Sequence, residues 1–172
     1  ASTSIQDAVD SNQTVLAEIT PLTRSLQNTF STFKDENLLE ALDYAVNYLA
    51  LNKTNFNLSD SDLLSGIKST IIAFLKTAES NNENLETAVS KLPEIVFSNL
   101  IPTRVKSWNG NVPIWAKDTS RLMMETIDVS GLVTESPLLQ ETLAKNSVSA
   151  LLKILSSSPE NANGFTSGVS NV

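Results

Sequence analysis

The stretch at residues 37–49, which reads NLLEALDYAVNYL, decides the fold class. Its apolar residues recur at intervals of three and four, the spacing that places side chains on one face of an α-helix. The residues that follow this rule are Leu38, Leu39, Leu42, Ala45, Val46 and Leu49. Asp35 is suited to cap this helix, because its side chain can accept a hydrogen bond from a free backbone N–H. The stretch therefore predicts an amphipathic helix.

The same spacing recurs on both sides of this stretch and predicts further helices. A first helix is expected from Ser4, with Pro21 kinking or breaking it near Thr20. Residues 59–62 can cap a third long helix, and Asn84 a fourth. Proline is favoured at the first position of a helix, so three more helical segments are expected to open at Pro93, Pro113 and Pro137.

These segments together predict an all-α protein. No stretch alternates apolar and polar residues for long enough to indicate a sheet. The fold class expected is an irregular bundle of about six to eight helices, broken by prolines. A chain of 172 residues fits one domain. We place that single helical domain at residues 1–155 and a flexible tail, rich in Ser, Asn and Gly, at residues 156–172.

Composition argues against several classes of function. The 12 basic and 19 acidic residues give a net charge of −7, which disfavours nucleic acid and anionic lipid as partners. The longest apolar runs have about five or six residues, as around Ile71–Leu75, so no membrane span is expected. The chain has no cysteine and no histidine. It therefore lacks thiolate nucleophiles, zinc–thiolate ligands and the commonest general base, and we predict no metal site and no enzyme.

Carboxylates are the remaining acid or base groups. Asp60 and Asp62 crowd the start of a predicted helix, and Glu36 and Glu40 lie one turn apart. Helix capping and a solvated helix face account for both pairs without catalysis. Asp60 and Asp62 begin like a calcium loop, but the required glycine and closing glutamate are missing. An enzyme that uses carboxylates alone stays open as an alternative, which replacing Asp60 or Asp62 would test.

Four aromatic residues are candidates for lining a ligand site. Trp108 and Trp115 flank a predicted turn, and Tyr44 and Tyr48 lie one turn apart on one helix. Such side chains combine a large apolar body with one polar group, which suits them to orient a flat lipophilic ligand. The alternative is that they pack in the core or at the rim of the bundle. The tryptophan region could also mark the seam of a homodimer.

Three triplets would permit N-glycosylation in a secretory route. Their asparagines are Asn12, Asn52 and Asn57. Ala1 is not followed by a basic and apolar signal, so a leader was either never made or has been removed. A chain rich in Asn and Ser also produces such triplets by chance.

Several short motifs, read in order, resemble one repeat of the peridinin–chlorophyll a protein family, the soluble light-harvesting proteins of dinoflagellates. They occur in the family's order with similar spacing over about residues 5–155. The matching motifs are Ile5-x-Asp7-Ala8, Leu39-Glu40-Ala41-Leu42, Leu63-Leu64, Leu92-Pro93-Glu94 and Val112-Pro113-Ile114-Trp115-x-Lys117.

The resemblance implies an all-α half-shell that pairs with a second copy around carotenoid, chlorophyll and lipid. It also implies a chloroplast lumen location after removal of a leader. Family members hold the chlorophyll magnesium indirectly through a histidine on the third helix, whereas the corresponding stretch here, Lys68–Ile72, has none. Thr70 is a poor substitute, and another lipophilic molecule, or none, would fit as well. Thr70, Ile71 and Phe74 complete our set of candidate lining residues.

Two functions from different classes follow. The first is a non-enzymatic carrier that holds apolar ligands, whether pigment or lipid, in a helical shell. The second is a secreted structural or surface-active protein, whose amphipathic helices would open and spread at an interface. Bound chromophore or lipid in natural material would favour the first, and strong lowering of surface tension would favour the second.

Overall fold

A computed structural model describes residues 2–34, 36–81, 85–99 and 137–157, together with residues 117, 120–121, 124–125 and 127–128. The predicted all-α bundle is confirmed, because helices without any strand make up the regular structure of these residues. The named helices are α1 (Ser2–Asp10), α2 (Ile19–Phe30), α3 (Glu36–Leu51), α4 (Asp60–Ser80), α5 (Leu85–Ser98) and α7 (Pro137–Ser157).

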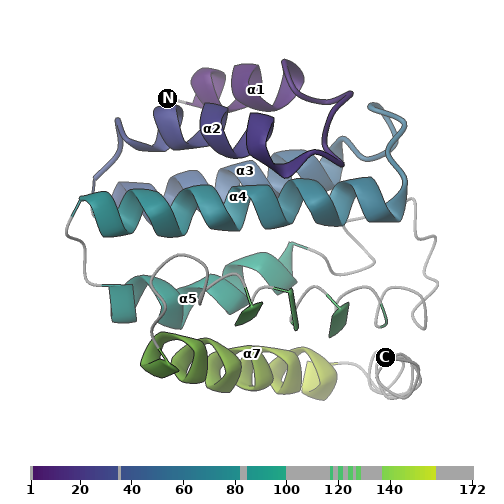
Figure 1. Cartoon of the computed structure of the whole chain (residues 1–172). Coiled ribbons are helices and arrows are strands. Elements are labelled where there is room, and N and C mark those ends of the chain that lie inside the picture. The colour runs from purple at the N-terminus through teal and green to yellow at the C-terminus, as the bar shows by residue number, and fades with distance from the viewer. Residues whose placement is uncertain are drawn as a thin grey trace.

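The helices stack in layers (Figure 1). The α1 and α2 helices form the first layer and pack on a central layer of α3 and α4. Helix α5 contacts both helices of the central layer, and α7 packs against α5 on the far side. The long helix α4 touches α2, α3 and α5, so it holds the layers together.

One hydrophobic core runs through these layers. The apolar face predicted for residues 37–49 is buried in α3. Leu38, Leu42 and Leu49 are at most 2% exposed, while Leu39 is only partly buried. The largest fully buried aromatic residues come from three different helices: Phe30 of α2, Phe74 of α4 and Phe97 of α5. The core therefore links segments that are far apart in the sequence.

Small residues allow α2 and α4 to pack closely. Thr23 donates a hydrogen bond to the carbonyl of Ile19 in its own helix at 2.8 Å and lies 3.4 Å from the carbonyl of Ser69. Ser69 in turn donates from α4 to the Ile19 carbonyl at 3.1 Å. These hydroxyls are buried, and their hydrogen bonds satisfy them where larger side chains would push the helices apart.

Two proline predictions were wrong in position. The chain leaves the helical path at residues 11–18, upstream of Thr20, and Pro21 lies in the first turn of α2. Proline is tolerated there because the first backbone N–H groups of a helix have no partner within it. The break comes earlier because the Asn12 side chain donates to the Ala8 carbonyl at 2.7 Å, which satisfies the end of α1.

Pro93 does not open a new helix but lies inside α5. A proline within a helix removes one hydrogen bond, yet here the buried face continues across it without a change of spacing. That face consists of Ala88, Val89, Leu92, Pro93, Val96 and Phe97. The buried area on both sides of Pro93 compensates for the missing bond, so the predicted fourth and fifth segments are one helix.

The other predicted helix starts have mixed outcomes. Ser59 caps α4 as predicted, since its hydroxyl accepts from the backbone N–H of Asp62 at 3.0 Å. Helix α7 starts at Pro137 as predicted, and α1 starts at Ser2, two residues before Ser4. The predicted caps Asp35 and Asn84 lie outside the described residues. The same holds for the start of the segment predicted to open at Pro113 and for most of the predicted tail, residues 158–172.

Over the described part of the chain, every helix is too short or too polar to cross a bilayer.

Gly66 offers a direct test of this packing. A Cβ added at Gly66 would lie 3.4 Å from Leu49 Cδ2 and 3.5 Å from Leu16 Cδ1, which is close to ordinary contact. Gly66→Ala should therefore raise the free energy of unfolding by about 0.5–1 kcal/mol through helix propensity. Gly66→Leu should lower it by about 2 kcal/mol, because its extra atoms overlap the same leucines. Urea denaturation of both variants measures these changes, and a stable Gly66→Leu protein would contradict the packing described.

Candidate functional site

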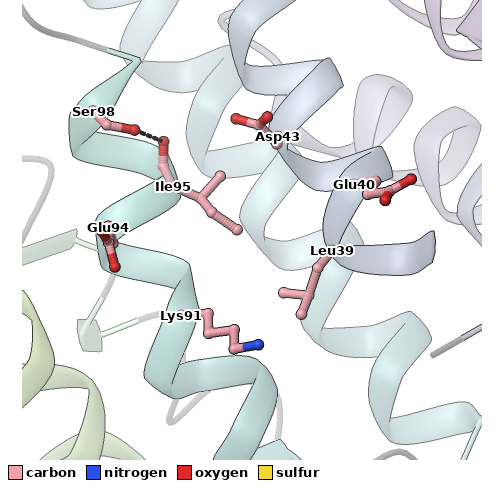
Figure 2. Close-up of a pocket in the computed structure, with 7 residues that line it drawn as sticks. All are labelled: Leu39, Glu40, Asp43, Lys91, Glu94, Ile95 and Ser98. Atoms are coloured by element: carbon pink, nitrogen blue, oxygen red, sulfur yellow. Dashed lines mark hydrogen bonds between the residues drawn. The ribbon is translucent and has the colours of Figure 1, made fainter. Parts of the chain in front are cut away.

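The candidate site is a groove between α3 and α5 with a volume of about 540 Å³ (Figure 2). Helix α3 contributes three lining residues and α5 four. The lining residues are Leu39, Glu40, Asp43, Lys91, Glu94, Ile95 and Ser98. The charged members are exposed, so the groove is open to solvent along its length. Its volume lies within the usual range for small-molecule sites, about 300–1,000 Å³.

Helix geometry explains why these residues line one groove. Lys91, Glu94, Ile95 and Ser98 are spaced by three, one and three residues, so they share one face of α5. That face is adjacent to the buried one, because Leu92 and Val96 pack in the core. The groove therefore forms where the half-buried edges of two amphipathic helices meet.

The groove has an apolar floor and a charged rim. The side chains of Leu39 and Ile95 point into the space between the helices, and the Lys91 side chain extends toward Leu39 (Figure 2). Three carboxylates and one ammonium group lie among the lining residues, so the rim has an excess of negative charge. Such a surface favours a ligand that has an apolar body and a neutral or positive polar group.

A buried amide fixes the two helices relative to each other at one end of the groove. Asn99 directly follows α5 and is 2% exposed. Its Nδ2 donates to Asp43 Oδ1 at 2.8 Å and to the Ile95 carbonyl at 2.8 Å. Its Oδ1 accepts from Asn47 Nδ2 at 2.9 Å. Because Asp43 and Ile95 both line the groove, this network sets the width of the groove.

The rim also touches α7. Lys153 Nζ lies 2.9 Å from Glu94 Oε1 in an ion pair whose side chains are 74% and 64% exposed. An exposed pair of this kind contributes little to stability. It does neutralise one of the three rim carboxylates, which leaves Glu40, Asp43 and Lys91 as the other charged groups of the rim.

The predicted lining residues Tyr44 and Tyr48 lie outside this groove, on another face of α3. Their rings stack with centroids 6.3 Å apart, and Tyr48 meets the ring of Phe56 edge-on at 6.1 Å. Gln6 of α1 donates to the Tyr44 hydroxyl, and Tyr48 donates to Asp10 Oδ1 at 2.7 Å. The half-buried pair therefore attaches α1 to α3, which agrees with the alternative role at the rim of the bundle.

Burial, together with the hydrogen bond to the Asp10 carboxylate, raises the pKa of Tyr48 to about 12. Because the folded protein holds this proton more tightly than an unfolded chain with a pKa near 10, the contact stabilises the fold fully below pH 10. That contribution is lost as the pH rises through about 12.

An absorbance titration at high pH tests this contact. The chain has two tyrosines, so a Tyr44→Phe background isolates Tyr48. There, Asp10→Asn should lower the Tyr48 pKa part of the way from about 12 toward 10, since burial remains. Glu79→Gln, on the exposed face at the end of α4, is the matched control and should leave the Tyr48 pKa unchanged. A Tyr48 pKa near 10 before Asp10 is replaced would contradict the contact.

Thr70, Ile71 and Phe74 are all 0% exposed and belong to the packed interior. The Thr70 hydroxyl donates to the Gly66 carbonyl at 2.8 Å, so its polar group is satisfied within α4. None of the three lines the groove. Trp108 and Trp115 lie outside the described residues.

The three candidate glycosylation sites have different environments. Asn12 is 8% exposed, and its Nδ2 donates to the Ala8 carbonyl and to Ser25 Oγ. Asn52 is half-buried and donates to the Tyr48 carbonyl at 2.8 Å. Asn57 is exposed and adopts a left-handed backbone conformation with φ 55°. Only Asn57, of these three, presents an accessible amide to a glycan.

Two of the candidate carboxylates, those of Asp60 and Asp62, belong to the start of α4. Asp60 pairs with Lys53 at 2.7 Å, where the Lys53 side chain is only 8% exposed. Asp62 belongs to the capped first turn of α4. Glu40 lines the groove, but its carboxylate is directed away from α5 (Figure 2). Within the described residues, no three acidic side chains gather closely enough to hold a metal ion.

Comparison with protein-family models, with curated proteins and with solved structures gives no match for this chain. Leu39-Glu40-Ala41-Leu42 and Leu92-Pro93-Glu94 are separate motifs in the sequence, and the structure brings Leu39 and Glu40 of the first and Glu94 of the second to one groove. The sequence did not predict Asp43, Lys91, Ile95 and Ser98, for which the only signal was their position beside a buried stripe.

Proposed function

We propose that this chain is a non-enzymatic binding protein that holds a small amphipathic molecule in the groove between α3 and α5. The observation that carries the proposal is the groove itself, with an apolar floor, a charged rim and a volume of about 540 Å³. The apolar body of the ligand would lie on Leu39 and Ile95, and its polar group would face Asp43 and Lys91.

The charge of the rim supports one class of ligand over another. Even when Lys153, paired with Glu94, is counted beside Lys91, the three carboxylates outnumber the lysines, so an anionic head group such as that of a fatty acid would meet repulsion. A neutral or cationic head group would not. The family resemblance implies carotenoid, chlorophyll or lipid as ligands. An open groove would hold one part of such a molecule, not the whole of it.

A probe titration tests the groove. The neutral fluorescent compound N-phenyl-1-naphthylamine should bind, and dodecylamine should displace it at lower concentration than dodecanoate. Ile95→Trp fills the groove and should weaken probe binding by about tenfold, the loss of about 1.4 kcal/mol. Leu51→Trp places the same side chain at an exposed position away from the groove and should leave binding unchanged.

The proposal fails if the probe does not bind, or if Ile95→Trp binds it as well as the unaltered chain does. Circular dichroism of both variants separates loss of binding from loss of fold. An absorption spectrum and a native mass spectrum of protein from its own source then report bound pigment or lipid directly.

A second candidate, the surface-active protein, is favoured by large apolar residues that face solvent. Leu51, Leu138 and Leu152 are 57%, 68% and 59% exposed. Side chains of this kind adsorb at an air–water or lipid interface. Strong lowering of surface tension by the full chain would support this candidate, and a surface tension close to that of buffer would exclude it.

A further inference from the structure

Helix α7 has a second apolar face that the rest of the described structure leaves exposed. Leu138, Val148 and Leu152 are 68%, 51% and 59% exposed. Glu141 and Lys145 lie between them and are also exposed. The five positions 138, 141, 145, 148 and 152 are separated by three, four, three and four residues. That spacing is the heptad seam along which two helices pack.

The opposite face of α7 is already occupied. Leu139, Leu143 and Ala150 are at most 9% exposed and belong to the core. Helix α5 is the neighbour against which α7 mainly packs, and the ion pair of Lys153 with Glu94 joins the same two helices. The exposed seam therefore lies on the outer side of the bundle, where α7 forms the lowest layer in Figure 1.

The charges on the seam select the orientation of a partner helix with the same sequence. A parallel pair in register would place Glu141 against Glu141 and Lys145 against Lys145, and both contacts are repulsive. An antiparallel pair centred at residue 143 places Glu141 against Lys145 of the other copy. The same register places Leu138 against Val148, and two-fold symmetry repeats both pairs.

We propose that two copies of this chain associate through this face of α7 as an antiparallel, two-fold symmetric helix pair. The seam carries one acidic and one basic residue, so it is neutral, although the whole chain has a net charge of −7. Two copies can therefore meet here without the repulsion that their overall charge would cause elsewhere. The partner is a second copy because positions 138, 141, 145 and 148 of the seam are complementary to themselves in one register and one orientation.

Sedimentation equilibrium of the full chain, over a wide range of protein concentration, tests the proposal. The unaltered chain should form a dimer. Lys145→Glu and Glu141→Lys should each weaken the dimer by about tenfold or more, because each creates two contacts between like charges. The double variant Glu141→Lys with Lys145→Glu exchanges the charges and should restore the dimer. Lys76→Glu, at an exposed position on α4, is the matched control and should dimerise like the unaltered chain.

Circular dichroism confirms that each variant is folded, since all the replaced side chains are exposed. A monomer at every concentration would overturn the proposal. A dimer that tolerates both single charge reversals would overturn it too, because the association would then use another surface. Failure of the double variant to restore the dimer would show that Glu141 and Lys145 do not pair between copies, and that result would overturn the proposal as well.

Discussion

Burial of α4 on most of its sides is the constraint on which the rest of the structure depends. Twelve of its 21 residues are buried, and they include the consecutive positions Ala73, Phe74 and Leu75. A helix with apolar residues around most of its circumference is stable in water only if neighbours cover several faces. Helices α2, α3 and α5 provide that cover. The layered arrangement of the helices follows from this need to cover α4 on several sides.

The candidate groove is a consequence of this constraint. Because α3 and α5 both pack on α4, they lie beside each other with their half-buried edges facing. Leu39 and Ile95 are partly buried at those edges, and Asp43 and Lys91 stand at the solvent side. The Asn99 network then holds the two helices at a fixed separation. The site therefore depends on the core although none of its charged residues lies in the core.

Local sequence predicted most of the helices because spacing and caps are local signals. The stripe in residues 37–49, the Ser59 cap and the start at Pro137 all depend on neighbours within a few residues. Pro93 was placed wrongly because the effect of a proline depends on tertiary burial: it is retained within α5 by core contacts on both sides. The groove could not be predicted for the same reason. Nothing in the spacing of Asp43 and Lys91 indicates which two helix edges will meet.

Native-state hydrogen exchange of the full chain tests the central role of α4 most directly. Amides of residues 63–78 should exchange only through global unfolding, with a free energy of opening equal to that from urea denaturation. Amides of α7, which packs mainly on α5, should open at lower free energy. Slower exchange in α7 than in α4 would contradict the account, because the structure would then not be organised around α4.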